Sequence, residues 1–261
     1  MSILFRVISY LKYILKAGNA HGLHSPFVYE LYVSEISKQK TYYHFNFIER
    51  LRNNLLVSDK TIQLTDLGAG NNGHIKKERQ IKAIAYSSLS NKKTCELLFK
   101  LVNKFEPKNI IEIGTSLGVS TIYMALANSK SSLYTLEGAE EVMAIAKEQF
   151  QFSKTKNIYP ILGNFNQTLQ PLVDSLSSVD LVFFDGNHQY KPTIQYFECC
   201  LAKATENTIF VFDDIYWSTE MKKAWDEISA RPEVTISIDL YDLGIIFFRN
   251  NQEKQHFVLK F

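Results

Sequence analysis

Apolar and polar positions follow two alternating patterns from about residue 94 onward. Short continuous apolar runs predict buried strands, because strands of a parallel sheet covered on both faces carry few polar positions. These runs lie at residues 109–113, 132–136, 158–162, 179–184 and 208–212. Helical spacing predicts helices at residues 120–127, 140–152, 165–176, 193–204 and 219–230. The alternation predicts right-handed βαβ units in a doubly wound, mostly parallel α/β sheet.

The end of the chain departs from this alternation. Residues 233–240 and 244–248 predict two strands joined by a short turn, which makes an antiparallel hairpin. With the five earlier strands they give a Rossmann-like, seven-stranded sheet, to which residues 256–260 can add one short strand. Residues 1–93 are mostly helical in pattern, so we expect an N-terminal helical extension or cap before a domain at residues 94–261.

The first helix of that extension is amphipathic. Its apolar positions recur at helical spacing and comprise Leu4, Val7, Ile8, Leu11, Ile14 and Leu15. The basic residues Arg6, Lys12 and Lys16 lie on the other side. We expect the helix to pack against its own domain or against a second copy, which would give a homodimer. A membrane surface is the alternative for a basic amphipathic helix. Beyond it, Ser25 and Pro26 predict the start of a second helix that runs to about Lys38.

Composition narrows the class of protein. The 261 residues include 46% hydrophobic and 21% charged residues, and a net charge of +2 is too balanced for a dedicated nucleic-acid binder. No apolar run is long enough to span a bilayer. The three cysteines, Cys95, Cys199 and Cys200, have neither a disulfide-framework spacing nor a zinc spacing. These features favour a cytoplasmic protein.

Glycines and an acid follow the first two strands. Gly114 and Gly118 permit a tight turn at the start of a helix, where a backbone can approach a ligand closely. Glu137 ends the next strand, where a carboxylate can accept both hydroxyl groups of a ribose. A nucleoside cofactor explains this pair better than a plain turn does. A dinucleotide motif would carry a glycine where Ser116 stands, which weakens the alternative of a nicotinamide-dependent oxidoreductase.

The segment EIGTSLGVST at residues 112–121 resembles the first motif of class I S-adenosylmethionine-dependent methyltransferases. Its form is similar to the O-methyltransferase branch that includes the catechol and caffeoyl-CoA enzymes. The resemblance implies that Glu112, Gly114 and Thr115 flank the methionine part of S-adenosyl-L-methionine. It further implies that Glu137 binds the ribose and that Asn164 and Phe165 lie at the adenine. Gly118 and Gly138 complete the predicted cofactor loops.

A second glycine-rich segment competes with this loop. Asp66 to Gly70 reads DLGAG after an apolar run, but no second strand that ends in an acid follows about twenty residues later. The polar residues Lys76 to Arg79 are typical of a helix start instead. We therefore expect a loop in the N-terminal cap.

Three aspartates follow the last two parallel strands. Asp185, Asp213 and Asp214 would repel one another at neighbouring strand ends unless a hard cation lay among them. Helix capping is the alternative role, although Ser218 and Thr219 already precede the last helix.

The segment DGNHQY at residues 185–190 is similar to the D-G-x-H-x-Y segment of metal-dependent O-methyltransferases. The resemblance implies that Asp185, Asp213 and Asp214 bind a divalent cation, Mg²⁺, and that Asp185 and the general base His188 are catalytic. We expect methylation of an oxygen on a small-molecule acceptor. A methyltransferase-fold protein that binds without turnover is the remaining alternative.

Overall fold

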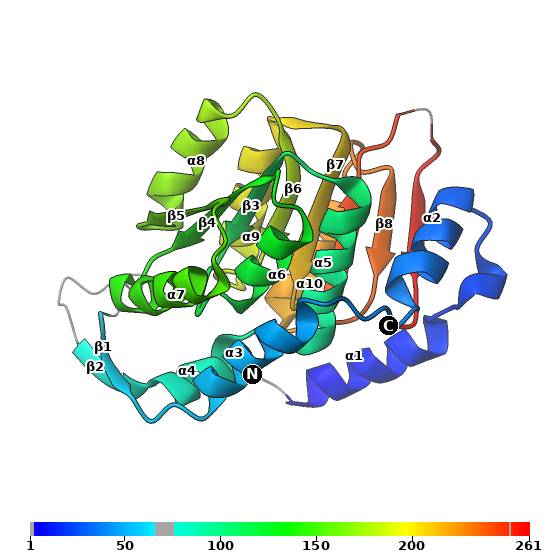
Figure 1. The fold of residues 1–261 in the computed structure, drawn as a ribbon. Helices are drawn as coiled ribbons and strands as arrows, with labels where there is room; N and C mark the ends of the chain where they lie inside the picture. Colours follow the sequence, from blue (N-terminus) through cyan, green and yellow to red (C-terminus); the bar gives the residue numbers. More distant parts are fainter. Residues whose placement is uncertain (1–2, 66–75, 251) are drawn as a thin grey trace. The chain divides into compact units, whose positions relative to one another are not determined.

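The computed structural model describes residues 3–65, 76–250 and 252–261 (Figure 1). The chain forms two compact units, each with its own strands and helices. Unit 1 combines residues 1–40 with residues 173–261, and unit 2 comprises residues 41–172. The predicted loop at Asp66–Gly70 lies outside the described residues.

Unit 2 contains the first parallel strands. β3 (Asn109–Ile113) pairs with β4 (Ser132–Glu137), which pairs with β5 (Ile158–Leu162), all in parallel. The crossovers are α6 (Val119–Ala127) and α7 (Glu140–Ser153). α8 (Phe165–Ser175) follows β5. These bounds agree closely with the predicted elements, because apolar runs and helical periodicity are the strongest local signals of secondary structure in a sequence.

The rest of unit 2 precedes β3 in the chain. It comprises α3 (Phe45–Leu56), β1 (Thr61–Thr65), β2 (Lys76–Gln80), α4 (Ile81–Ser88) and α5 (Lys92–Phe105). Apolar side chains of α3, α4 and α5 share one buried core with α6 and α7, centred on residues such as Phe45, Phe99 and Tyr123. The helix start predicted at Lys76 is wrong. Lys76 to Gln80 instead pair antiparallel with Thr61 to Thr65, and the helix begins at Ile81.

Unit 1 contains the later strands. β6 (Val179–Phe184) pairs in parallel with β7 (Ala204–Asp213) around α9 (Tyr190–Leu201). α10 (Thr219–Ala230) precedes the antiparallel hairpin of β8 (Ile236–Asp239) and β9 (Leu243–Phe247). β10 (Gln255–Val258) then pairs in parallel with β8. Leaving β1 and β2 aside, the described residues thus hold eight strands, and the eighth is the short C-terminal strand that the sequence left optional. The mostly parallel α/β class with a closing hairpin is confirmed.

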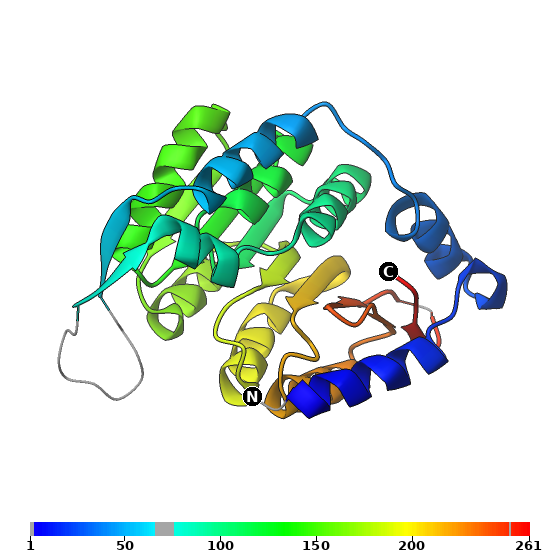
Figure 2. The ribbon, with the colours of Figure 1, turned by 90° about the horizontal axis from the view of Figure 1, so that it is seen from below.

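The N-terminal part of unit 1 consists of short helices beside the C-terminal strands (Figure 2). They are α1 (Ile3–Lys16), the 3₁₀ turn η1 (Ala20–Gly22), α2 (Pro26–Leu31) and the π-helical turn η2 (Tyr32–Ile36). The Ser25 hydroxyl caps α2 with Pro26 at its first position, as predicted. α1 is held by hydrogen bonds from the Tyr13 hydroxyl to the carbonyl of Leu259 and from the Tyr241 hydroxyl to the carbonyl of Arg6.

The apolar side chains of α1 face away from the rest of unit 1, although an amphipathic helix usually buries such side chains. The helix packs on its own unit, as expected, but the buried side chains are those of Ser9 and Tyr13. The apolar residues Leu4, Val7, Ile8, Leu11, Ile14 and Leu15 are all exposed. The rest of unit 1 therefore leaves this face uncovered, and packing against a second copy stays a prediction.

Candidate active site

The loop between β3 and α6 is shaped by left-handed backbone conformations. Gly114, Ser116 and Gly118 have positive φ angles of 107°, 48° and 82°. The N–H groups of Gly114 and Thr115 both donate to the carbonyl of Leu136, 3.0 Å away in each case. The loop is therefore anchored to the end of β4 while it turns into α6, and the predicted pair Gly114 and Gly118 performs the conformational role expected of glycine.

Glu137 joins this loop to the end of β4. Its carboxylate accepts the N–H of Ser116 at 2.9 Å through Oε2 and the N–H of Ala139 at 3.0 Å through Oε1. Burial raises the pKa of the carboxyl, and the N–H groups of Ala139, Ser116 and Gly138 act in the opposite direction. The structure thus brings Glu137 and the 114–118 loop together, as the motif predicted.

Glu112 lies beneath the loop and is completely buried. Its carboxylate accepts hydroxyl hydrogen bonds from Ser120 and Thr135, both at 2.6 Å, and from Thr121. Thr115 in turn is hydrogen-bonded to Thr135, with 2.5 Å between the two hydroxyl oxygens. Burial, opposed by these hydroxyl donors, raises the pKa of Glu112 to about 7. Glu112 therefore supports the loop from below, and its role toward the methionine part of a cofactor stays a prediction.

The end of β5 provides the remaining cofactor residues of the prediction. Gly163 has a φ of 142°, and its N–H donates to the carbonyl of Glu137 at 2.9 Å. Asn164 follows it, is exposed, and accepts the N–H of Asn166 at 2.9 Å through its side chain. Phe165 is half-buried at the start of α8. All eight predicted cofactor residues thus lie in unit 2, at the carboxyl ends of three adjacent parallel strands, which is where open α/β sheets bind ligands.

The sequence analysis did not find the contacts of two further residues near this loop, Ser88 and Glu49. The Ser88 hydroxyl, at the end of α4, lies 2.7 Å from the Ser116 hydroxyl. Glu49 of α3 accepts hydrogen bonds from Tyr123 of α6 and from Arg52, both at 2.9 Å. No motif marks these residues, and only the i,i+3 spacing of Glu49 and Arg52 is visible in the sequence. They connect the N-terminal helices of unit 2 to the loop and to the helix that follows it.

The three aspartates predicted as metal ligands lie in unit 1. Asp185 directly follows β6, Asp213 ends β7, and Asp214 follows with a left-handed φ of 55°. Burial and the charges of Asp185 and Asp214 hold the pKa of Asp213 well above its usual range, and its carboxyl is hydrogen-bonded to that of Asp185. The side chains therefore converge, as their strand-end positions predicted.

Helix capping does not account for these aspartates. The cap of α9 is Gln189, four positions after Asp185, and the cap of α10 is Ser218, whose hydroxyl accepts the N–H of Met221 at 3.1 Å. The carbonyl of Asp214 instead accepts the N–H of Trp217 at 2.8 Å, which closes a turn.

His188 faces the aspartates from the loop before α9. Its Nε2 lies 3.6 Å from Oδ1 of Asp185. Burial lowers the pKa of the imidazole, and the charge of Asp214 acts against that shift. A neutral imidazole of this kind can accept a proton. Four sequence-predicted residues of the catalytic and metal group are thus brought together in unit 1.

Proximity of acidic side chains does not by itself make a metal site, because the side chains must also be arranged around the ion. Within the described ranges, no group of three or more His, Cys, Asp or Glu side chains is arranged to hold a metal ion. The donor chemistry nevertheless suits a hard cation, because carboxylate oxygens are the ligands that Mg²⁺ prefers.

The two aromatic residues that follow the aspartates have different surroundings. Tyr216 packs against Tyr241 and donates to Asp239 at 2.8 Å, whereas Trp217 is 36% exposed beneath the guanidinium of Arg6.

Comparisons with known proteins place part of the sequence among methyltransferases. Residues 111–215 match the family model described as a methyltransferase domain. An uncharacterised protein of Acanthamoeba polyphaga mimivirus is 28% identical over 149 residues, which cover 51% of this chain and 66% of that protein. The catechol O-methyltransferase of Niastella koreensis is 31% identical over 132 residues, covering 49% of this chain and 58% of the enzyme. The chain thus spans less than two thirds of the length of these curated relatives.

Solved structures share the fold at low sequence identity. An O-methyltransferase from Bacillus cereus in complex with SAH superimposes with a TM-score of 0.55 at 18% identity, covering 84% of this chain and 97% of that one. An SAH-bound methyltransferase from Podospora anserina has a TM-score of 0.55 at 15% identity, covering 82% and 100%. The resemblance read from residues 112–121 is confirmed: residues 111–215 match a methyltransferase domain, and the chain shares the fold of these SAH-bound methyltransferases.

Proposed function

We propose that the protein transfers a methyl group from S-adenosyl-L-methionine to an oxygen of a small molecule, with the help of a divalent cation. The observation that carries this proposal is the pairing of the 114–118 loop with the carboxylate of Glu137 through the N–H of Ser116.

The proposed location of the protein is the cytoplasm. The three cysteines form no disulfide within the described chain, which supports a place in the reducing cytoplasm.

The cofactor half of the proposal rests on unit 2. Glu137 would bind the two ribose hydroxyls with the lone pairs left after it accepts Ser116 and Ala139. Gly114 and Thr115 would flank the methionine part, Gly118 and Gly138 would keep the backbone close to the ligand, and Asn164 and Phe165 would lie at the adenine. The sulfonium of the bound cofactor supplies an already activated methyl group, so the protein has to position the reactants and remove a proton.

The acceptor half of the proposal rests on unit 1. Asp185, Asp213 and Asp214 would hold the cation, which on binding an acceptor hydroxyl would lower its pKa. His188 would accept the hydroxyl proton as the oxygen forms its bond to the methyl carbon and the carbon–sulfur bond breaks. The products are a methyl ether, S-adenosylhomocysteine and the protonated imidazole. The hydrogen bond between the carboxyl groups of Asp185 and Asp213 supports a ligand shared by these two acids.

A turnover assay separates these roles. With a catechol as the trial acceptor, we expect production of S-adenosylhomocysteine that EDTA abolishes and Mg²⁺ restores. Asp213→Asn should behave like the EDTA-treated protein. His188→Ala should lower the rate by about 10²–10⁴-fold, the usual contribution of a general base, while leaving S-adenosylhomocysteine affinity unchanged. As a matched control, Asp226→Asn replaces an exposed acid of α10 and should leave the rate unchanged. Full activity in EDTA would remove the cation from the proposal.

A further inference from the structure

The first helix presents its apolar side to solvent. Seven large apolar side chains of α1 are exposed, and they comprise Leu4, Val7, Ile8, Tyr10, Leu11, Ile14 and Leu15. Leu4, Leu11 and Leu15 are 66%, 57% and 87% exposed. At 100° per residue these seven positions occupy about 160° of the helix circumference without a charged residue among them. We call this surface the α1 apolar face.

The opposite side of α1 attaches the helix to unit 1. Ser9 and Tyr13 are buried there, the Tyr13 hydroxyl donates to the carbonyl of Leu259 at 2.5 Å, and Gly18 just beyond the helix exchanges backbone hydrogen bonds with the C-terminal residues Val258 and Lys260. This attachment fixes the direction in which the apolar face points. Amphipathic helices of globular domains normally bury the apolar side, so the reversed orientation calls for a partner.

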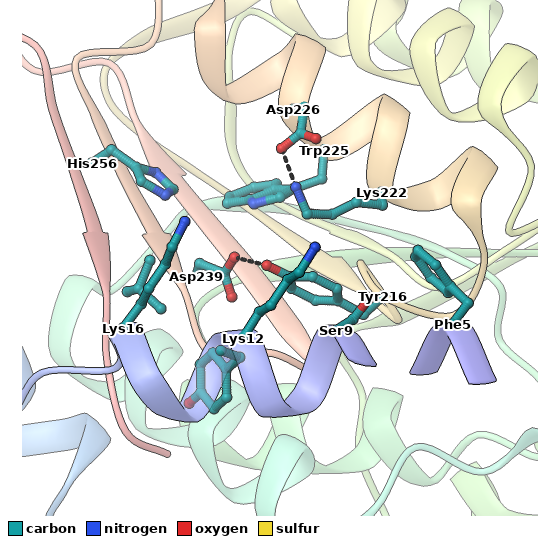
Figure 3. Close-up of a pocket in the computed structure, with 12 residues that line it drawn as sticks. Phe5, Ser9, Lys12, Lys16, Tyr216, Lys222, Trp225, Asp226, Asp239 and His256 are labelled. Atoms are coloured by element: carbon teal, nitrogen blue, oxygen red, sulfur yellow. Dashed lines mark hydrogen bonds and ion pairs between the residues drawn. The ribbon is translucent and has the colours of Figure 1, made fainter. Parts of the chain in front are cut away.

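The charges on α1 restrict what that partner can be. The helix has three basic residues, Arg6, Lys12 and Lys16, and no acidic one. On the helical wheel Arg6 and Lys12 flank the apolar arc, one on each side. Lys12 and Lys16 also border a cavity of about 370 Å³ between α1 and α10 (Figure 3), and neither forms an ion pair with a carboxylate in the part of the chain that the structure describes.

We propose that α1 anchors the protein to an anionic lipid surface, with the α1 apolar face in the bilayer interface and with the flanking residues Arg6 and Lys12 at the level of the headgroups. Interfacial helices have this combination of a charge-free apolar arc and basic flanks. Within the described residues no helix is long and apolar enough to cross a bilayer, so the attachment would be peripheral.

A second copy of the chain fits this surface less well. Two α1 helices packed through their apolar faces would bring together the four basic side chains that flank those faces, with no acid on either helix to neutralise them. An anionic lipid surface neutralises the same charges, at about 1 kcal/mol for each basic residue near it. Charge complementarity therefore favours lipid.

Vesicle flotation of the full chain tests the proposal. We expect binding to vesicles of phosphatidylcholine and phosphatidylglycerol, weaker binding to phosphatidylcholine alone, and loss of the difference at high salt. Leu11→Glu combined with Leu15→Glu should abolish binding without changing the circular dichroism spectrum, because both side chains are exposed. Arg6→Gln combined with Lys12→Gln should weaken binding by about 25-fold, or about fivefold for each residue.

The matched control substitutes exposed apolar residues elsewhere. Val57→Glu combined with Phe152→Glu removes two comparably exposed side chains of unit 2 and should leave vesicle binding intact. Absence of vesicle binding, or equal loss in the control, would overturn the proposal. So would light scattering that shows a stable dimer in solution which Leu11→Glu with Leu15→Glu converts to a monomer, because the second copy would then be the occupant of the α1 apolar face.

Discussion

The carboxylate of Glu137, which we propose binds the ribose, is held by two backbone hydrogen bonds. Its two oxygens are each held by a backbone N–H, from Ser116 and from Ala139, so the carboxylate is fixed in orientation. A carboxylate has about four lone-pair positions, which leaves room for two further donors. Glu137 could be predicted as a ribose ligand from its distance in sequence from Gly114. The hydrogen bond from Ser116 could not be predicted, because Ser116 was noted only as the residue at a position where a dinucleotide motif has glycine.

Replacing Glu137 with alanine tests its proposed contact with the ribose. Glu137→Ala should weaken S-adenosylhomocysteine binding by about 1.5–3 kcal/mol, the scale of hydrogen bonds lost to a charged group. Calorimetry measures the change, and circular dichroism checks the fold. Glu140→Ala removes an exposed acid three residues away and should bind like the wild type. An unchanged affinity of Glu137→Ala for S-adenosylhomocysteine would contradict the proposed contact with the ribose.

Glu112 makes stability depend on pH in a specific window. Its pKa in the folded protein is raised from 4.5 to about 7. A raised pKa means that the folded state holds the proton more tightly, so the associated stability is complete below about pH 4.5, falls as pH rises to about 7, and is constant above. The shift corresponds to about 3 kcal/mol.

The measurement is urea unfolding of the wild type and of Glu112→Gln across this window. The amide does not titrate, so the free energy of unfolding of the wild type should fall by about 3 kcal/mol relative to that of the variant between pH 4.5 and pH 7. Parallel curves for the two proteins would show that Glu112 is not the group responsible.

At the scale of elements, the strands with a clear local apolar pattern could be predicted from the sequence, and elements that depend on distant contacts could not. β3, β5 and β6 were predicted at their observed bounds, because mostly apolar runs of five or six residues are typical of strands; β3 and β6 are mostly buried, whereas β5 is partly exposed. β2 was missed, because its sequence KKERQ has no apolar residue and becomes a strand only through pairing with β1. The side of α1 that contacts unit 1 was not predicted, since periodicity identifies an apolar face but not which face contacts the rest of the chain.

The turn from β3 into α6 depends on Gly118. Its φ is 82°, and an added Cβ would lie 2.6 Å from Cε1 of the core residue Phe150. Gly118→Ala should therefore destabilise the protein by about 2–4 kcal/mol, through backbone strain and overpacking together. Gly22→Ala is the matched control, because nothing lies within 4 Å of the added atom. Its free energy of unfolding should stay within about 0.5 kcal/mol of the wild type. Equal stability of both variants would contradict the observed turn.

At the scale of the molecule, both units depend on contacts that no local pattern records. Unit 1 joins residues 1–40 to residues 173–261, and the backbone of Gly18 pairs with that of Val258 and Lys260 across most of the chain. The motifs nevertheless predicted candidate residues that lie together within each unit, since ligand-binding residues gather at strand ends whose positions the apolar runs indicate. The supporting residues Ser88, Glu49 and Arg52 could not be found, because their partners are distant in sequence and carry no motif.

The central claim is that unit 2 binds S-adenosylmethionine rather than a nicotinamide dinucleotide. Calorimetry of the full chain with S-adenosylhomocysteine, beside a parallel titration with NAD, tests it most directly. The 114–118 loop and Glu137 predict saturable binding of one S-adenosylhomocysteine per chain and no heat of binding with NAD. Saturable binding of NAD without binding of S-adenosylhomocysteine would contradict the account.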